Sequence, residues 1–443
     1  MSTTEGVDGQ GAAGPGGTDR ALVISSDGHA MAKMPDYTPY IPNGYQEEFE
    51  SFLAVYRQYG SDLGSSDPDL MALKLEPEYA LGWRDNIVAG RLEGLSDPAR
   101  RLPLMEEQGV AAEVLFPDFG LPFQMQMRAM LAAGITSSPE QRAAGYRAHN
   151  RWLADFCSVA PGRFAGMACL SFHDVDAAVQ EIHWAKEAGL KGIVLPAFDE
   201  DSPLYLDRFD PIWRTLVELE LPANTHAATS MTTSRQLHVG TEPHVSCGFT
   251  MYQQELFFVS RQILHHFIWG GVLERHPELK VVMTEQGSGW VVGVLEAMDY
   301  TYEGSYLPRD LRRVIKHKPS EYFQRQMFLG SSIFSRAEVE IRDQIGLDKM
   351  MLGMDYPHIE GTWGVGPGTP AYLQATLGAA GVPRAEAELL LSRNAVDVFG
   401  FDPVALDPVR RRIGPEMAEI LTPPTEDHYP RGDVHKPIGA PVA

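Results

Sequence analysis

The chain has 443 residues, 44% of them hydrophobic, and carries 59 acidic against 37 basic side chains, a formal net charge of -22. This length can bury a large core, and the negative charge argues against a general role in binding nucleic acids or anionic membranes. The three cysteines, Cys157, Cys169 and Cys247, are too few and too scattered for a disulfide framework, and no apolar run is long enough to span a membrane. We therefore expect a cytoplasmic protein with neither nucleic-acid nor membrane partners.

Eight short apolar runs, most of them followed by amphipathic stretches, predict alternating strands and helices. An open doubly wound sheet would give the same local signals, but the number of strand candidates favours an α/β fold closed into a parallel (β/α)8 barrel, the TIM barrel. In chain order, the predicted strands cover residues 21–25, 111–117, 163–170, 190–196, 220–226, 279–285, 326–332 and 350–355.

The rest of the chain divides around this barrel. Residues 1–19 are rich in Gly and are predicted to be a disordered tail, and residues 404–443 form a polar, Pro-rich C-terminal extension. The barrel covers residues 20–403. Within it, residues 31–105 form a long insertion after the first strand, which we expect to be a substrate lid or the contact surface of a homodimer.

Acidic and imidazole side chains follow four predicted strands at their carboxyl ends, which meet at one rim of a parallel barrel. Each of them alone could be an ordinary loop residue or a helix cap. Their joint placement predicts a metal centre. The residues are Asp27 and His29 after the first strand, His226 at the fifth, Glu285 at the sixth, and Asp355 with His358 at the eighth.

Five motifs resemble the amidohydrolase superfamily, in particular its branch of decarboxylases and related hydrolases. They are SSDGH, HNRWLADFCSVAPGRFAGMACL, GGVLERHPELKVVMTEQGSGWV, MLGMDYPHIEGTW and LLSRNAVDVFGFD, and together they extend over most of residues 21–403. The resemblance implies a (β/α)8 barrel in which Asp27, His29, His226 and Asp355 occupy the metal-ligand positions of the family.

The chain departs from the decarboxylase pattern at the sixth strand. Decarboxylases of this branch typically read HMGE there, whereas this chain has Glu285-Gln286-Gly287-Ser288. A carboxylate thus replaces the imidazole, and Ser288 replaces the acid. The change argues against simple decarboxylation and gives a ligand set rich in both carboxylate and imidazole, which suits iron.

The chain is also similar to a small group of TIM-barrel non-haem diiron monooxygenases, known from the hydroxylation of diterpenoids in the pathway to platensimycin and platencin. This resemblance implies two iron ions, dioxygen, an electron donor and a bulky apolar acyl or acyl-CoA substrate. It implies that His265 or His266 completes the ligand set, although the two could equally be ordinary helix residues. Asp355, Glu285 and His358 are the predicted catalytic residues.

Two alternatives stay open at this point. The first is a metal-dependent hydrolase or decarboxylase that uses zinc or manganese, with Asp355 as the general base. The second is a catalytically silent barrel, which the clustered acids argue against, because unpaired buried acids are costly.

One cationic stretch could bind the phosphates of a CoA-linked substrate. Arg309, Arg312, Arg313 and Lys316 follow helical spacing, so they would share one face of a helix. A solvated helix face is the ordinary interpretation of such a pattern. We therefore take Arg309, Arg312 and Arg313 as predicted substrate-binding residues, with that alternative open.

Overall fold

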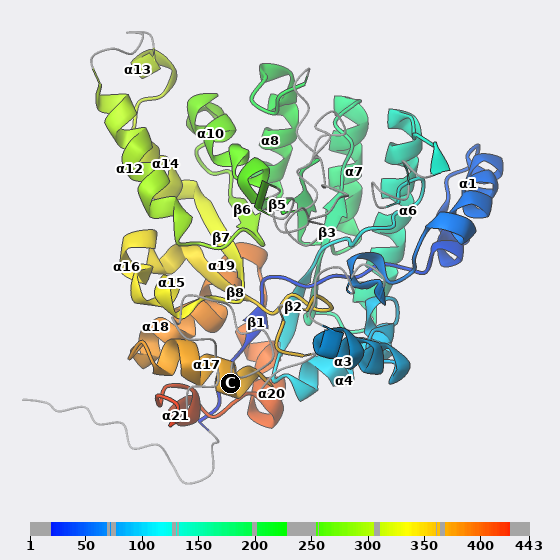
Figure 1. The fold of residues 1–443 in the computed structure, drawn as a ribbon. Coiled ribbons are helices and arrows are strands. Elements are labelled where there is room, and N and C mark those ends of the chain that lie inside the picture. The colour runs from blue at the N-terminus through cyan, green and yellow to red at the C-terminus, as the bar shows by residue number, and fades with distance from the viewer. Residues whose placement is uncertain are drawn as a thin grey trace, which may run out of the picture.

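The structure is a computed structural model, and eight parallel strands alternate with helices in it around a barrel (Figure 1), which confirms the predicted fold class. It describes residues 19–68, 71, 77–125, 130, 133–196, 202–227, 254–255, 257–304, 311–359, 361–363 and 368–425. The predicted tail except Asp19, residues 426–443 of the predicted extension, Cys247 and Arg309 lie outside these ranges. The strands are β1 Ile24–Ser25, β2 Ala112–Leu115, β3 Phe164–Cys169, β4 Gly192–Val194, β5 Ala223–His226, β6 Val281–Thr284, β7 Met327–Ser332 and β8 Met350–Gly353.

The strands follow one another around the sheet in chain order, each parallel to its neighbours. The sheet closes where β8 meets β1. The backbone N–H of Ser26 donates to the carbonyl of Leu352 at 2.7 Å, and the N–H of Asp355 donates to the carbonyl of Asp27 at 2.9 Å. The first and last strands are therefore joined directly at the carboxyl rim of the barrel.

Helices surround the sheet, and local signals in the sequence explain where several begin. Ser138 and Gln141 cap each other's backbone N–H groups at the start of the helix after β2, a capping box that fixes its first turn. No described helix is both long and apolar enough to cross a membrane. The longer helices are α1 Gln46–Tyr59, α3 Pro77–Val88, α4 Pro98–Glu107, α6 Pro139–Ser158, α7 Val175–Glu187, α8 Asp210–Glu218, α10 Gln262–Trp269, α12 Trp290–Glu303, α14 Pro319–Gln326 and α20 Pro403–Ile413. The shorter ones are α11 Val272–Arg275, α13 Leu311–Val314, α15 Arg336–Glu340, α16 Arg342–Ile345, α17 Gly368–Leu373, α18 Arg384–Glu388, α19 Asn394–Phe399 and α21 Met417–Ile420.

The barrel interior is filled by apolar side chains from alternate strand positions, such as Val114, Met167 and Val282. Phe399 and Leu406, from α19 and α20, belong to the same buried cluster. The interior is thus a packed core, and the predicted metal ligands lie beyond it at the carboxyl rim.

The insertion after β1 packs against the loop that follows β8. Trp83 and Leu92 of the insertion share a buried cluster with Tyr356 and Trp363, which come after β8. The hydroxyl of Ser66 also donates to the carbonyl of Pro357 at 3.3 Å. The insertion therefore covers the β8 loop, whereas its predicted role as a lid or dimer contact stays a prediction.

A pH-dependent ion pair joins the C-terminal helix α20 to α4. Both guanidinium N–H groups of Arg412 donate to Glu106, and Arg163 lies 2.9 Å from the same carboxylate. The hydrogen bonds from Arg412 and Arg163 lower the pKa of Glu106 to about 2, although partial burial acts in the opposite direction. Because the folded pKa lies below the usual glutamate value of 4.5, Glu106 contributes stability above about pH 4.5 and loses it as the pH falls towards 2.

We therefore expect Glu106→Gln to lower the free energy of unfolding by about 1 kcal/mol at pH 7, discounted because the carboxylate is 27% exposed. The difference between variant and wild type should shrink as the pH falls below 4.5. Urea denaturation at pH 7, 4.5 and 3 measures it. A difference that stays constant across these pH values would contradict the assignment.

Candidate metal centre

The predicted acids and imidazoles converge at the carboxyl rim of the barrel. Asp27 and His29 follow β1, His226 is the last residue of β5, and Asp355 lies two residues beyond β8. All four are at most 2% exposed. Elements far apart in the sequence thus place two carboxylates and two imidazoles in one buried location.

The distances place these side chains in two overlapping groups of possible metal ligands that share His29. Nε2 of His29 lies 3.2 Å from Oδ1 of Asp355 and 3.9 Å from Oδ1 of Asp27. Nε2 of His226 lies 3.3 Å from the same oxygen of Asp27. Two groups of three residues offer ligand atoms within 4.8 Å of one another: Asp27, His29 and His226 form one, and His29, Asp355 and His358 form the other.

Several of these donor atoms fit a bound cation. Nδ1 of His29 is 2.9 Å from the carbonyl of Pro117, so it carries the proton and leaves the lone pair of Nε2 directed to the centre. That Nε2 and both carboxylate oxygens of Asp355 are buried without a hydrogen bond. Buried polar atoms are rarely left so, and a set of oxygen and nitrogen donors suits manganese, zinc or iron.

Glu285 lies beside the imidazoles. One of its oxygens is 3.2 Å from Nδ1 of His226, and the other is 3.8 Å from Nδ1 of His358. Its φ is 58° and that of Asp355 is 51°, a left-handed conformation that is uncommon for these residues. Two acids directly after strands are thus held in strained backbone, which is typical of functional sites.

His358 bridges two acids. Its Nδ1 is 2.8 Å from Oδ1 of Asp355, and its Nε2 is 3.8 Å from Oδ2 of Asp118. Burial alone would lower the pKa of His358, but the two carboxylates raise it well above its usual value. Burial would raise the pKa of Asp355, but the neighbouring His358 and His29 hold it well below its usual range. The geometry favours a charged His358 beside an ionised Asp355.

Asp118 and Ser332 are site residues that the sequence analysis missed. Asp118 lies in the loop after β2, and Ser332 is the last residue of β7. The hydroxyl of Ser332 donates to Oδ2 of Asp27, which leaves Oδ1 of Asp27 for the imidazoles. Their positions at strand ends are the only sequence signal that could have indicated them.

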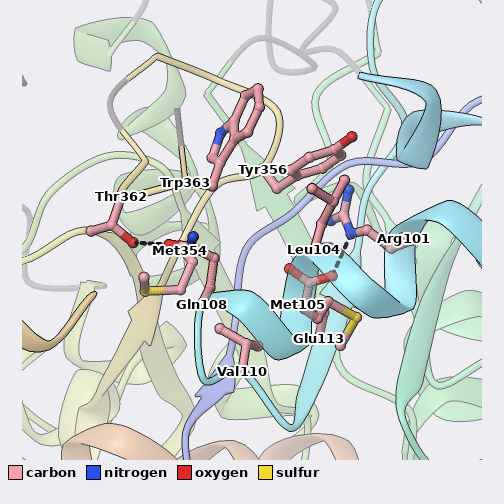
Figure 2. Close-up of a pocket in the computed structure, with 10 residues that line it drawn as sticks. All are labelled: Arg101, Leu104, Met105, Gln108, Val110, Glu113, Met354, Tyr356, Thr362 and Trp363. Carbon is pink, nitrogen blue, oxygen red and sulfur yellow. Dashed lines mark hydrogen bonds and ion pairs between the residues drawn. The ribbon is translucent and has the colours of Figure 1, made fainter. Parts of the chain in front are cut away.

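A buried ion pair supports the loop that carries His29. Arg101 of α4 and Glu113 of β2 are 2.7 Å apart and almost fully buried, and the guanidinium of Arg101 lies over the ring of Tyr356. Figure 2 shows this pair and Tyr356 lining a cavity with room for about one water molecule. A Cβ on Gly28 would lie 2.9 Å from Arg101, so only glycine lets the loop approach the pair this closely.

The other predicted residues lie elsewhere. His265 is exposed on α10, and the ring of His266 on the same helix meets the ring of Tyr205 at 5.4 Å. Arg312 and Arg313 are exposed on α13, beyond the C-terminal end of α12 (Figure 1). The structure does not bring these four residues into either group of candidate metal ligands.

Residues 91–401 match the family model described as Amidohydrolase. The chain belongs to the amidohydrolase family. The matched range includes His226, Glu285 and Asp355, whereas Asp27 and His29 precede it.

Several known proteins and solved structures resemble the chain. The γ-resorcylate decarboxylase of Polaromonas sp. is 23% identical over 267 residues, which are 58% of this chain and 76% of that protein. An amidohydrolase of Mycobacterium avium subsp. paratuberculosis gives a TM-score of 0.61 at 19% identity, over 86% of this chain and 99% of that one. The 5-carboxyvanillate decarboxylase of Novosphingobium aromaticivorans, complexed with manganese and 4-hydroxy-3-methoxy-5-nitrobenzoic acid, gives 0.56 at 21% identity, over 86% and 96%.

These findings correct the predicted reaction. The relatives whose names state a reaction are decarboxylases, which are lyases and not oxidoreductases, so the prediction of a diiron monooxygenase is wrong. The named relatives give no support for two iron ions, dioxygen, an electron donor or a CoA-linked substrate. Structural relatives have been solved with manganese and with small aromatic acids or phenols. The carboxylate at Glu285 does not identify the reaction, because oxygen and nitrogen ligands suit several metals and several reactions.

Proposed function

We propose that this amidohydrolase is a metal-dependent decarboxylase of a small aromatic carboxylic acid. The observation that carries the proposal is the buried set of Asp27, His29, His226 and Asp355 at the rim of the barrel. The family match and the decarboxylases among the relatives support the type of reaction.

The four residues would hold one divalent cation, for which manganese is the preferred candidate. When bound, the ion supplies Lewis acidity that orients and polarises the oxygen atoms of the substrate. Ser332 fixes the carboxylate of Asp27, and the carbonyl of Pro117 fixes the imidazole of His29. Such contacts align ligands before the ion arrives.

His358 and Asp355 supply the proton that aromatic decarboxylation requires. The bond between the ring carbon and the carboxylate breaks, CO2 leaves, and the ring carbon takes one proton in exchange. His358 carries that proton, and the ionised carboxylate of Asp355, 2.8 Å from its Nδ1, stabilises the charged ring. At the end of β6, this chain has Glu285 where decarboxylases of this branch typically have a histidine. The imidazole of His358, in the loop after β8, lies 3.8 Å from the carboxylate of Glu285. Glu285 also lies 3.2 Å from Nδ1 of His226, and it helps to position both rings.

The surroundings of the centre limit access of water. Tyr356 and Trp363 beside the β8 loop are buried under Trp83 and Leu92 of the insertion. Exclusion of water strengthens the electrostatic contacts in the site. Cys157 and Cys169 are free and buried, and a reducing cytoplasm remains the predicted compartment. A homodimer also stays a prediction.

The test measures release of CO2 from γ-resorcylate and 5-carboxyvanillate by the manganese-loaded protein, in air and under nitrogen. We expect equal rates in both atmospheres, with resorcinol formed from γ-resorcylate. Treatment with a chelator should reduce the rate by at least about 100-fold, and added manganese should restore it. The proposal would be overturned if CO2 were released only in the presence of oxygen. It would also be overturned if the protein hydrolysed an ester but released no CO2 from γ-resorcylate or 5-carboxyvanillate.

A further inference from the structure

One arginine lies between two of the loops that carry the candidate centre. The guanidinium of Arg261, directly before α10, donates from Nη2 to the carbonyl of Gln286 at 2.9 Å. The hydroxyl of its neighbour Ser260 donates to the carbonyl of Ala227 at 2.5 Å. Gln286 follows Glu285, and Ala227 follows His226. Arg261 is thus held at the carboxyl rim, beside the loops after β5 and β6.

The positive charge of Arg261 is poorly compensated. Its Nε is buried and makes no hydrogen bond, and within the described part of the chain Gln286 is its only hydrogen-bond partner. Its guanidinium carbon lies 4.7 Å from the ring centroid of Trp290, which further shields it from water. Burial lowers the pKa of Arg261, while the nearby carboxylate of Glu338 opposes this shift.

Both carboxylate oxygens of Glu338 accept hydrogen bonds from groups other than Arg261. One of its oxygens accepts from the backbone N–H groups of Ser288 and Gly289, and the other accepts from the N–H and hydroxyl of Ser335. Glu338 therefore holds the β6 loop in place and makes no ion pair with Arg261 within the described residues. A partly buried cation beside the β6 loop of the candidate metal centre, in a protein of net charge -22, points to an anionic ligand.

We propose that Arg261 binds the carboxylate of the aromatic acid and thereby selects anionic substrates. This inference rests on the proposed function, because it names what the same site recognises. A planar guanidinium can present two parallel N–H groups to a carboxylate, and the buried Nε of Arg261 makes no hydrogen bond in the structure. The contact of Nη2 with Gln286 fixes the side chain for this purpose before substrate arrives.

The test compares binding of γ-resorcylate with binding of resorcinol, which has the same ring without the carboxylate. Isothermal titration calorimetry uses the manganese-loaded wild type, Arg261→Met and Arg261→Lys. We expect Arg261→Met to weaken binding of the acid by about 10- to 100-fold, as for loss of a charge-assisted contact, and to change binding of resorcinol less than about twofold. Arg261→Lys should fall between wild type and Arg261→Met for the acid. The KM for the acid should rise in parallel, while kcat changes little.

Arg325→Met is the matched control. Arg325 also lies over an aromatic ring, that of Tyr322, at 5.1 Å, and it also donates to a backbone carbonyl, that of Leu273, at 2.9 Å. It is on α14, which leads into the amino end of β7, so it is at the opposite end of the barrel. This variant should bind both ligands as the wild type does.

The outcomes separate this inference from the proposed function. A wild type that binds γ-resorcylate through Arg261 but releases no CO2 would leave the inference standing and remove the proposed reaction. A wild type that releases CO2, with an unchanged KM in Arg261→Met, would overturn the inference alone. If Arg261→Met weakened the binding of γ-resorcylate and resorcinol equally, or if the wild type did not bind γ-resorcylate, the inference would be wrong. Arg261 would then only connect the β6 loop to the segment before α10.

Discussion

Replacing Asp355 with asparagine is expected to reduce the rate of CO2 release by about 1,000-fold while leaving the barrel folded. The substitution removes the charge that faces Nε2 of His29 at 3.2 Å and Nδ1 of His358 at 2.8 Å. It therefore removes both a candidate metal ligand and the partner that keeps a proton on His358. Asparagine tolerates the φ of 51° at this position better than most residues do, so the backbone should be retained.

The measurement for Asp355→Asn combines product analysis by liquid chromatography with the manganese content of the dialysed protein and its circular dichroism spectrum. Asp348→Asn is the control, because Asp348 is an exposed acid shortly before β8 that contacts only Lys349 among the described residues. Its activity should stay within about twofold of wild type, in line with a neutral surface substitution. An Asp355→Asn protein with more than a tenth of the wild-type rate would show that Asp355 does not act at the reacting atoms.

The second large effect concerns stability. Arg101→Met is expected to lower the free energy of unfolding by about 3–5 kcal/mol, because it leaves the carboxylate of Glu113 buried without its partner. The guanidinium also donates to the carbonyl of His29 at 3.3 Å and contacts the ring of Tyr356. The loss therefore extends to the loop after β1, and the affinity for manganese should fall as well.

A double-mutant cycle in urea tests this expectation. Arg101→Met combined with Glu113→Leu removes both charges, so the double variant should be clearly more stable than Arg101→Met alone. Arg100→Met is the control on the same helix. Arg100 pairs with Glu93 at the surface, with 66% and 51% of the two side chains exposed, and its loss should cost less than about 1 kcal/mol. If Arg100→Met and Arg101→Met proved equally stable, the buried pair would not hold the β1 loop.

The barrel could be predicted from the sequence because each strand is a short apolar run between turn signals. All eight runs contain a strand of the structure, although every strand is shorter than predicted, and β1 and β4 have only two and three residues in the ladder. The convergence of Asp27, His29, His226 and Asp355 could be predicted for the same reason, since parallel strands in a closed sheet must bring their carboxyl ends together.

Residues that depend on how distant segments pack could not be predicted. Asp118, Ser332 and Arg261 match no motif, and each acquires its role through a partner from another part of the chain. The position of the predicted phosphate-binding stretch in the sequence already argues against a place at the carboxyl rim. A segment that precedes the seventh strand, as Arg312 and Arg313 do, lies on the path back to the amino end of the barrel, away from the carboxyl rim.

The backbone hydrogen bonds between the ends of β1 and β8 determine when the site can form during biosynthesis. Asp27 emerges from the ribosome early and Asp355 late, yet the backbone of one is bonded to the backbone of the other and both face His29. Nearly the whole chain must therefore leave the exit tunnel before a complete coordination pocket exists. We therefore expect the proposed metal ion to bind late, after the barrel has closed. Truncated nascent chains should bind no metal tightly.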